Sequence, residues 1–137
     1  MKSLKLILLI GILALGSCDD ESMLNEVDCP AELFCTEELR TLTFHARING
    51  ESAILDSHYV KNMDNGNIYQ ADPLNDYLDE GHYIVVSDTK KDELRKSGTT
   101  LTFFGIQNGE IVIQQDFVVG HDCCHVVPVS GPFNGLD

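Results

Sequence analysis

The stretch His121-Asp122-Cys123-Cys124-His125 gathers two thiols and two imidazoles within five residues. Two further cysteines, Cys29 and Cys35, lie about 90 residues upstream. Thiols of an exported protein usually form disulfides, whereas imidazole and thiolate groups together can bind zinc or copper. The chemistry of this stretch therefore depends on the compartment of the protein and on the elements that bring the two ends of the chain together.

The N-terminus indicates export. Lys2 and Lys5 precede an uncharged apolar segment over residues 6–15, which is too short to span a bilayer. Small residues follow, so residues 1–17 are predicted to form a secretory signal peptide. Leu15-Gly16-Ser17-Cys18 resembles a bacterial lipobox, and this resemblance implies cleavage before Cys18 and attachment of lipid to its thiol. An ordinary cleaved signal with a chance cysteine is the alternative.

The charge of the chain is strongly acidic. It has 22 acidic and 9 basic residues and a formal net charge of −13, which becomes −15 when Lys2 and Lys5 leave with the signal. Such a surface repels phosphates, which excludes nucleic acid as a partner. Residues 18–28 are predicted to form the lipidated cysteine and a flexible acidic tether, and residues 29–137 a single β-sandwich domain.

The membrane that holds the anchor is not decided by the acidic run Asp19-Asp20-Glu21. The run resembles the surface-export signal of Bacteroidota lipoproteins. In enterobacterial lipoproteins, however, Asp directly after the cysteine resembles an inner-membrane retention signal. We expect an outer-membrane lipoprotein of the cell envelope that is exposed at the cell surface, and the alternative location stays open.

Alternating and turn-forming residues predict antiparallel strands. Apolar residues alternate with polar ones over residues 41–48, as in a half-buried strand. Asn-Gly pairs at 49–50, 65–66 and 108–109 each follow a β-prone run and predict type I′ hairpin turns. In the strand that starts at Glu110, four apolar residues are predicted to share one face: Ile111, Ile113, Phe117 and Val119.

Other segments depart from this pattern. Asp72-Pro73, with apolar residues behind it and Gly81 at the end, predicts helical turns that cap one end of the core. Residues 82–88 are apolar on both faces and predict a central strand. The charged residues 89–97 predict another helical turn, and residues 121–129 a final strand. Because proline cannot donate a ladder hydrogen bond, Pro128 predicts that this last strand lies at a sheet edge or ends there.

These segments predict an all-β protein, an antiparallel immunoglobulin-like or transthyretin-like β-sandwich of about seven strands with one or two short helical turns. A closed barrel is the alternative. The layout resembles carboxypeptidase regulatory-like and other prealbumin-like domains. The motif Val118-Val119-Gly120-His121-Asp122-Cys123-Cys124-His125-Val126, with Ser130-Gly131 behind it, also resembles small Bacteroidota-type lipoproteins. That resemblance spans most of residues 29–131 and brings no activity with it.

Four cysteines allow three disulfide connectivities. A bond between Cys123 and Cys124 is disfavoured because adjacent Cα atoms lie about 3.8 Å apart, below the usual disulfide range of about 4.4–6.8 Å. We therefore expect Cys29 and Cys35 to cross to Cys123 and Cys124. If residues 121–129 were one strand, the two adjacent cysteines would point to opposite faces and be reached from two sides.

A metal site is the alternative for the same stretch. On a strand, His121, Cys123 and His125 would share one face, about 6.7 Å apart, and could chelate zinc or copper. The fourth ligand would be His45, His58, His82 or a carboxylate, and the sequence selects none of them. A second oxygen-rich group does not match the spacing of a calcium loop, and we interpret it as a turn and a helix cap: Asp64, Asn65, Asn67, Asp72 and Asp76.

The sequence contains no nucleophile elbow, zincin helix or phosphate loop, so we expect a protein without enzymatic activity and without a cofactor. It also contains no tryptophan, which weakens the case for glycan stacking. The combination of anchor, tether and compact domain predicts a binding or accessory module. We expect a protein or glycan partner to bind at the loops formed by residues 71–81 and 88–98.

Overall fold

The computed structural model describes residues 29–135. The predicted signal peptide, the lipidation site Cys18 and the tether lie outside the described residues. Within 29–135 no helix is both long and apolar enough to cross a membrane. The elements, in chain order, are β1 (Thr41–His45), β2 (Arg47–Ile48), β3 (Glu51–Ser52), β4 (Ser57–Asn62), β5 (Ile68–Gln70), the 3₁₀ turn η1 (Pro73–Tyr77), β6 (His82–Ser87), the 3₁₀ turn η2 (Asp88–Glu93), β7 (Thr99–Gln107), β8 (Glu110–His121) and β9 (Val126–Ser130).

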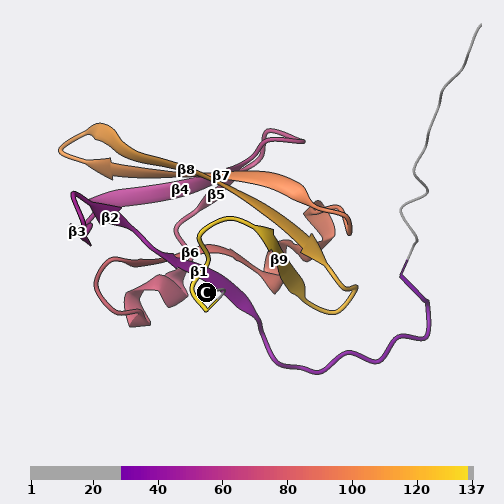
Figure 1. Ribbon diagram of the computed structural model, residues 1–137. Helices are drawn as coiled ribbons and strands as arrows, with labels where there is room; N and C mark the ends of the chain where they lie inside the picture. The colour runs from indigo at the N-terminus through magenta and orange to yellow at the C-terminus, as the bar shows by residue number, and fades with distance from the viewer. Residues whose placement is uncertain (1–28, 136–137) are drawn as a thin grey trace, which may run out of the picture.

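The strands form antiparallel sheets. Five of them make one sheet in the order β5-β4-β7-β8-β9, β1 pairs with β6, and β2 pairs with β3. Figure 1 shows the β1-β6 pair as a second layer below β4, β7 and β8. The prediction of an all-β sandwich with two short helical turns is confirmed, and seven strands of residues 29–135 have three residues or more. The separate sheets rule out the closed barrel.

The core lies between the two layers. Phe44 of β1 contacts Phe103 of β7 and Phe117 of β8, with ring centroids 4.7 and 5.0 Å apart. Both contacts are edge-to-face, the arrangement that aromatic quadrupoles favour. Because the side chains of β1 alternate, the even-numbered ones reach this core while the odd-numbered ones stay half exposed. The predicted alternation over residues 41–48 is thereby confirmed.

Two of the three Asn-Gly turns have the predicted geometry. Asn49 and Gly50 have φ values of 53° and 86°, and Asn108 and Gly109 have values of 52° and 79°, as a type I′ turn requires. The turn after β4 is different, because Gly66 has a positive φ and Asn65 does not. Here the buried Asn62 holds the turn, since its Oδ1 accepts the N–H groups of Asp64 and Asn65. Hydrogen bonds to the Asn62 side chain therefore stabilise this turn in place of the expected type I′ backbone conformation.

Three further predictions are corrected. Residues 82–88 do not form a central strand, because β6 pairs only with β1, and η1 and η2 pack beside it. Asp72 caps η1 as predicted, but η1 buries no residue and its Tyr77 is 86% exposed, so it does not close the core. Ile111 is 54% exposed, because the register of β7 and β8 shifts after Gly105, which pairs Ile111 with Ile106 and turns it away from the face of Ile113, Phe117 and Val119.

The final strand is also corrected. His121 ends β8, residues 122–125 form a turn, and β9 starts at Val126. The strand β9 is the edge of the five-stranded sheet, where Pro128 lies opposite Val119. The edge position of Pro128 is therefore confirmed, whereas the continuous strand over residues 121–129 is wrong.

Candidate functional site

Two disulfides fasten the N-terminal arm, residues 29–40, to the turn after β8. Cys29 bonds to Cys123 and Cys35 to Cys124, with Cα atoms 5.5 and 5.3 Å apart. The expected crossing of the two N-terminal cysteines to the C-terminal pair is confirmed, and the connectivity that the sequence left open is fixed. All twelve residues of the arm are exposed, so the disulfides hold a segment that buries little of its own surface.

The turn itself is held by Asp122. Its Oδ1 accepts the N–H of His125 at 2.7 Å and that of Cys124 at 3.0 Å. These bonds, led by the one from His125, keep the pKa of the Asp122 carboxyl below its ordinary value. Cys123 has a φ of 80°, a left-handed conformation that an extended strand does not contain. The two adjacent cysteines therefore reach separate partners because of a turn, and strand alternation is the wrong reason.

The predicted metal face is not formed by this turn. His121 Nδ1 accepts the N–H of Cys123 at 3.1 Å, and His125 instead contacts other segments. The sulfurs of Cys29 and Cys123 and a ring nitrogen of His121 do lie within 4.8 Å of one another. Those two sulfurs are bonded to each other, however, so neither is a free thiolate for a metal. A metal at His121, Cys123 and His125 would require reduction of the disulfide.

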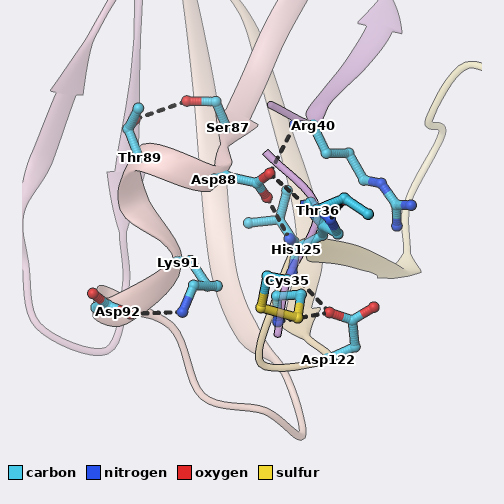
Figure 2. A network of polar contacts seen from close by, with 12 residues as sticks. Cys35, Thr36, Arg40, Ser87, Asp88, Thr89, Lys91, Asp92, Asp122 and His125 are labelled. Carbon is cyan, nitrogen blue, oxygen red and sulfur yellow. Dashed lines mark hydrogen bonds and ion pairs between the residues drawn. A yellow bond between two sulfur atoms is a disulfide. The ribbon is translucent and has the colours of Figure 1, made fainter. Parts of the chain in front are cut away.

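A second network ties the same turn to the start of η2, as Figure 2 shows. His125 Nδ1 lies 2.7 Å from Asp88 Oδ2, and His125 Nε2 lies 3.0 Å from Thr36 Oγ1. The backbone N–H groups of Arg40 and Val126 also donate to Asp88, each at 2.7 Å. We call these five residues the Asp88 latch, because they join the arm, η2 and β9.

The charge of the Asp88 carboxylate is stabilised by the groups that donate hydrogen bonds to it. The side chains of Asp88 and His125 are only 12% and 13% exposed. Burial by itself would raise the pKa of Asp88, but the bonds from His125, Arg40 and Val126 outweigh it and the pKa lies below the ordinary value. Asp88 was not singled out by the sequence reasoning, since one acidic residue between a strand and a charged segment carries no distinctive pattern.

The latch has the connectivity of a nucleophile-base-acid triad, from the Thr36 hydroxyl through His125 to Asp88. Two features give it a structural role instead. Asp88 holds two backbone N–H groups besides the imidazole, and Thr36 directly follows the cross-linked Cys35 on the exposed arm. Larger clefts among residues 29–135 are lined by other residues. The trio therefore fastens the arm.

The remaining histidines lie elsewhere. His45 of β1 stacks on His82 of β6 with centroids 4.3 Å apart, and the Ser52 hydroxyl lies 2.7 Å from His45 Nε2. Burial, followed by Arg47 and His82, lowers the pKa of His45. His58 lies on β4 and faces the core. None of the three belongs to the group of possible ligands near Cys123.

The oxygen-rich turn and cap residues behave as interpreted from the sequence. Asp64 forms an ion pair with Arg95 at 2.9 Å, and the N–H of Asn67 donates to Asn65 Oδ1 at 2.8 Å. Asp72 caps η1 through a bond from the Leu74 N–H at 2.9 Å. These contacts are those of turns and of a helix cap.

An open cleft lies between β4, β5 and β6, next to η1. It has a volume of about 570 Å³, within the range of small-molecule sites. A smaller cavity of about 40 Å³ adjoins it, and His58, Gln70 and Asp72 line both. We call the two together the His58 cleft. Residues from both predicted partner loops contribute to its wall, including Asp76 of the first loop and Lys90 of the second.

His58 is the unusual residue of this cleft. It is 8% exposed, stacks on Phe103 at 5.3 Å and meets the Tyr83 ring edge-on at 4.9 Å. Its Nε2 is buried and has no hydrogen-bond partner among residues 29–135. Burial lowers the pKa of His58, so the ring is neutral near pH 7. A buried polar atom without a partner costs about 1–3 kcal/mol, and such atoms are uncommon in folded proteins.

Comparison of the chain with protein-family models, with curated proteins and with solved structures finds no match in any of the three.

Proposed function

We propose that this protein is a lipoprotein, anchored in the cell envelope through Cys18, whose non-catalytic β-sandwich is a binding module. The observation that carries the proposal is the His58 cleft, which opens between the loops that the sequence marks as partner loops. A domain that leaves a buried imidazole unpartnered beside a cleft, while every cysteine it contains is cross-linked, is better suited to binding than to redox or thiolate chemistry.

The finer parts of the proposal rest on the sequence. The basic start, the short apolar segment and Leu15-Gly16-Ser17-Cys18 support a lipid anchor. More than one acyl chain is enough for stable anchoring, at about 0.8 kcal/mol per buried CH₂. The likeness to Bacteroidota-type lipoproteins supports an outer-membrane location at the cell surface. The immunoglobulin-like or transthyretin-like type of sandwich belongs to the same proposal.

The anchor is tested first, by expressing the full-length chain and its Cys18→Ser variant in a bacterium with a lipoprotein pathway. The natural chain should fractionate with membranes and carry acyl mass on its N-terminal peptide, and the variant should leave the membrane fraction. Equal fractionation of the two, without acyl mass, would refute the anchor. Protease treatment of intact cells then distinguishes surface exposure from an inward-facing location.

The binding role is tested by grafting. Residues 73–77 are replaced by Gly and Ser in one variant, and the exposed Asn108-Gly109 turn is replaced in a matched control. Molecules cross-linked to the anchored protein in its own membrane are identified by mass spectrometry. A specific partner should be lost with the first graft and retained with the second. A partner that survives both grafts, or no partner at all, would contradict a role for the loops.

A further inference from the structure

A separate pocket lies between the β1-β2 strands and residues 132–135, which follow β9. It is lined by His45, Arg47 and these four residues, and we call it the Arg47 pocket. Its volume of about 280 Å³ is close to the lower end of the range for small-molecule sites, about 300 Å³. Asn134 holds the second wall in place, because its N–H donates to the Thr43 carbonyl at 2.9 Å and its side-chain amide to Thr43 Oγ1 at 3.0 Å.

The charge of the Arg47 pocket is opposite to that of the His58 cleft. Three carboxylates line the larger part of the cleft, whereas no acidic residue between 29 and 135 lines the Arg47 pocket. Its ionisable side chains are those of Arg47 and His45. In a chain with 22 acidic and 9 basic residues, this pocket is a locally basic place that favours an anion.

The two ring nitrogens of His45 have different partners. Arg47 Nη2 lies 3.1 Å from Nδ1, and Ser52 Oγ lies 2.7 Å from Nε2. Because a guanidinium can only donate, Nδ1 is the acceptor, and the proton of the neutral ring is on Nε2, which donates to Ser52. This tautomer prevents His45 from accepting the hydroxyl proton of Ser52, so the pair is not a catalytic dyad.

The neighbours of the His45 ring leave one edge for the pocket. A Cβ added to Gly81 would lie 3.2 Å from both Cδ2 and Nε2, so the backbone of Gly81 covers that edge. His82 stacks on the ring, with centroids 4.3 Å apart, and covers one face. Since His45 lines the pocket all the same, the edge that it presents there is the one with Nδ1, beside the guanidinium of Arg47.

Protonation of His45 changes what this edge can bind. Burial, followed by Arg47 and His82, keeps the pKa of His45 below its ordinary value of 6.5, so the ring is neutral near pH 7. At lower pH a proton enters on Nδ1 and removes the lone pair that Arg47 uses. Two positively charged donors then lie side by side. A carboxylate can offer one oxygen to each of them, which replaces the lost hydrogen bond and offsets the repulsion.

No carboxylate in the described part of the domain already neutralises these donors. The acidic residues on the elements beside His45 are Glu51 on β3 and the pair Asp79-Glu80 before β6. Their side chains make no hydrogen bond or ion pair with any residue from 29 to 135. The charges that act on the pKa of His45 are those of Arg47 and His82, and both are basic groups.

We propose that the Arg47 pocket binds a small carboxylate when His45 is protonated. One carboxylate oxygen accepts from His45 Nδ1 and the other from the Arg47 guanidinium, and the apolar part of the ligand lies along Pro132 and Phe133. At pH 7 the guanidinium donates to the neutral Nδ1 instead, and the pocket binds weakly. The site is separate from the His58 cleft, and the inference does not depend on the proposed role of the loops or of the lipid anchor.

NMR titration of the full-length protein in detergent, at constant ionic strength, tests the proposal with butyrate as the probe. Butyrate should shift the side-chain ¹⁵N resonances of His45 saturably at pH 5.5 and should bind at least tenfold more weakly at pH 7.5. Butyramide, which has a similar shape without the charge, should not shift them. Equal binding at the two pH values, equal binding of butyramide, or no saturable shift would overturn the proposal.

The proton and the carboxylate must favour each other to the same extent. Tenfold tighter binding to the protonated protein therefore corresponds to a rise of about one unit in the pKa of His45 at saturating butyrate. His125 of the latch is an internal control, and its titration should not change. A rise of the same size in both histidines would show a general salt effect and refute the site.

Variants locate the site. Arg47→Gln should weaken butyrate binding at pH 5.5 at least tenfold, because one of the two charged donors is lost. Arg47→Lys, which keeps the charge, should retain part of the binding and shows that a loss does not come from unfolding. Arg95→Gln is the matched control, since Arg95 is also exposed but pairs with Asp64 at 2.9 Å and does not line the pocket. His45→Gln should abolish the pH dependence. Unaltered binding in Arg47→Gln, or an equal loss in Arg95→Gln, would contradict the assignment.

Discussion

The Asp88 latch and the His58 cleft both contain an enclosed histidine, and the two histidines differ in the hydrogen bonds of their ring nitrogens. His125 is 13% exposed in its side chain and has a partner for each ring nitrogen. His58 is 8% exposed and leaves Nε2 without one. Since proteins rarely bury an unpaired polar atom, the contrast separates a histidine whose two ring nitrogens are bonded within the fold from one with an unpaired ring nitrogen.

The two regions also differ in how they are cross-linked. The latch lies beside both disulfides and joins three segments that are far apart in the sequence. The cleft is formed by hairpin strands and by a 3₁₀ turn that buries no residue. Covalent cross-links thus hold the arm and the turn after β8, and no residue that lines the cleft is cross-linked.

The largest effect is expected from the disulfides. The bonds have sequence separations of 94 and 89, so either one alone closes nearly the same loop. Replacing all four cysteines by alanine should lower the free energy of unfolding by about 4–5 kcal/mol in the chain-entropy model. Removing only Cys35 and Cys124 should cost far less. Urea denaturation measures both. A loss on removing Cys35 and Cys124 as large as that on removing all four cysteines would contradict the expectation that one bridge closes the loop by itself.

The second largest loss of stability is expected from substitution of Asp88. Asp88→Ala leaves the N–H groups of Arg40 and Val126 and the imidazole of His125 without their acceptor, and should lower the free energy of unfolding by about 2–4 kcal/mol. Asp92→Ala is the control, because its side chain is 92% exposed and pairs only with Lys91. Its effect should stay below about 0.5 kcal/mol.

Acid titration sharpens the same prediction. The pKa of Asp88 is lower in the folded protein than its ordinary value of 3.8, so the unfolded chain takes up a proton first as the pH falls. The stability that Asp88 contributes is present above pH 4 and is lost as the pH falls through the folded pKa. Asp88→Ala should remove part of this acid loss. An unchanged acid profile in that variant would assign the loss to other carboxylates.

Exchanging each enclosed histidine for phenylalanine compares the two regions directly. His58→Phe removes an unpaired polar atom and should leave stability unchanged or raise it by about 1 kcal/mol. His125→Phe breaks two hydrogen bonds and should lower stability by about 2 kcal/mol. Thermal unfolding at pH 7 measures both. Loss of stability in His58→Phe equal to that in His125→Phe would remove the contrast between the regions.

The histidine at position 58 also predicts a pH dependence. Because burial lowers its pKa below 6.5, the unfolded chain binds a proton that the folded protein does not, and stability falls as the pH falls below 6.5. The advantage of His58→Phe over the natural chain should therefore grow between pH 7 and pH 5. A constant difference across this window would mean that His58 is solvated in the folded protein.

The smallest effect is expected on the arm. Phe34 is 96% exposed, so Phe34→Ser should change the free energy of unfolding by less than about 0.5 kcal/mol. The matched variant Phe44→Ala, in the core, should cost about 3–5 kcal/mol. A large effect of Phe34→Ser would show that the arm is held by apolar contacts as well as by the latch and the disulfides.

The amino-acid pattern by itself determined the β class, two type I′ turns, the cap of η1 and the edge position of Pro128. These features depend on neighbouring residues, such as Asn49 with Gly50 or Asp72 with Pro73, and local backbone preferences are enough to specify them. The sequence also predicted that Cys29 and Cys35 pair with the C-terminal cysteines, because the adjacent residues Cys123 and Cys124 are poorly placed to pair with each other.

Only the tertiary structure decided the connectivity of the cysteines and the roles of the histidines. Whether Cys29 meets Cys123 or Cys124 depends on how the arm approaches the turn, and the turn depends on Asp122 rather than on strand alternation. Asp88 meets His125 across 37 residues, and His58 faces a cavity made by three separate segments. Hydrogen-bond partners so distant in sequence leave no periodic pattern, so a satisfied histidine and an unsatisfied one look the same until the chain is folded.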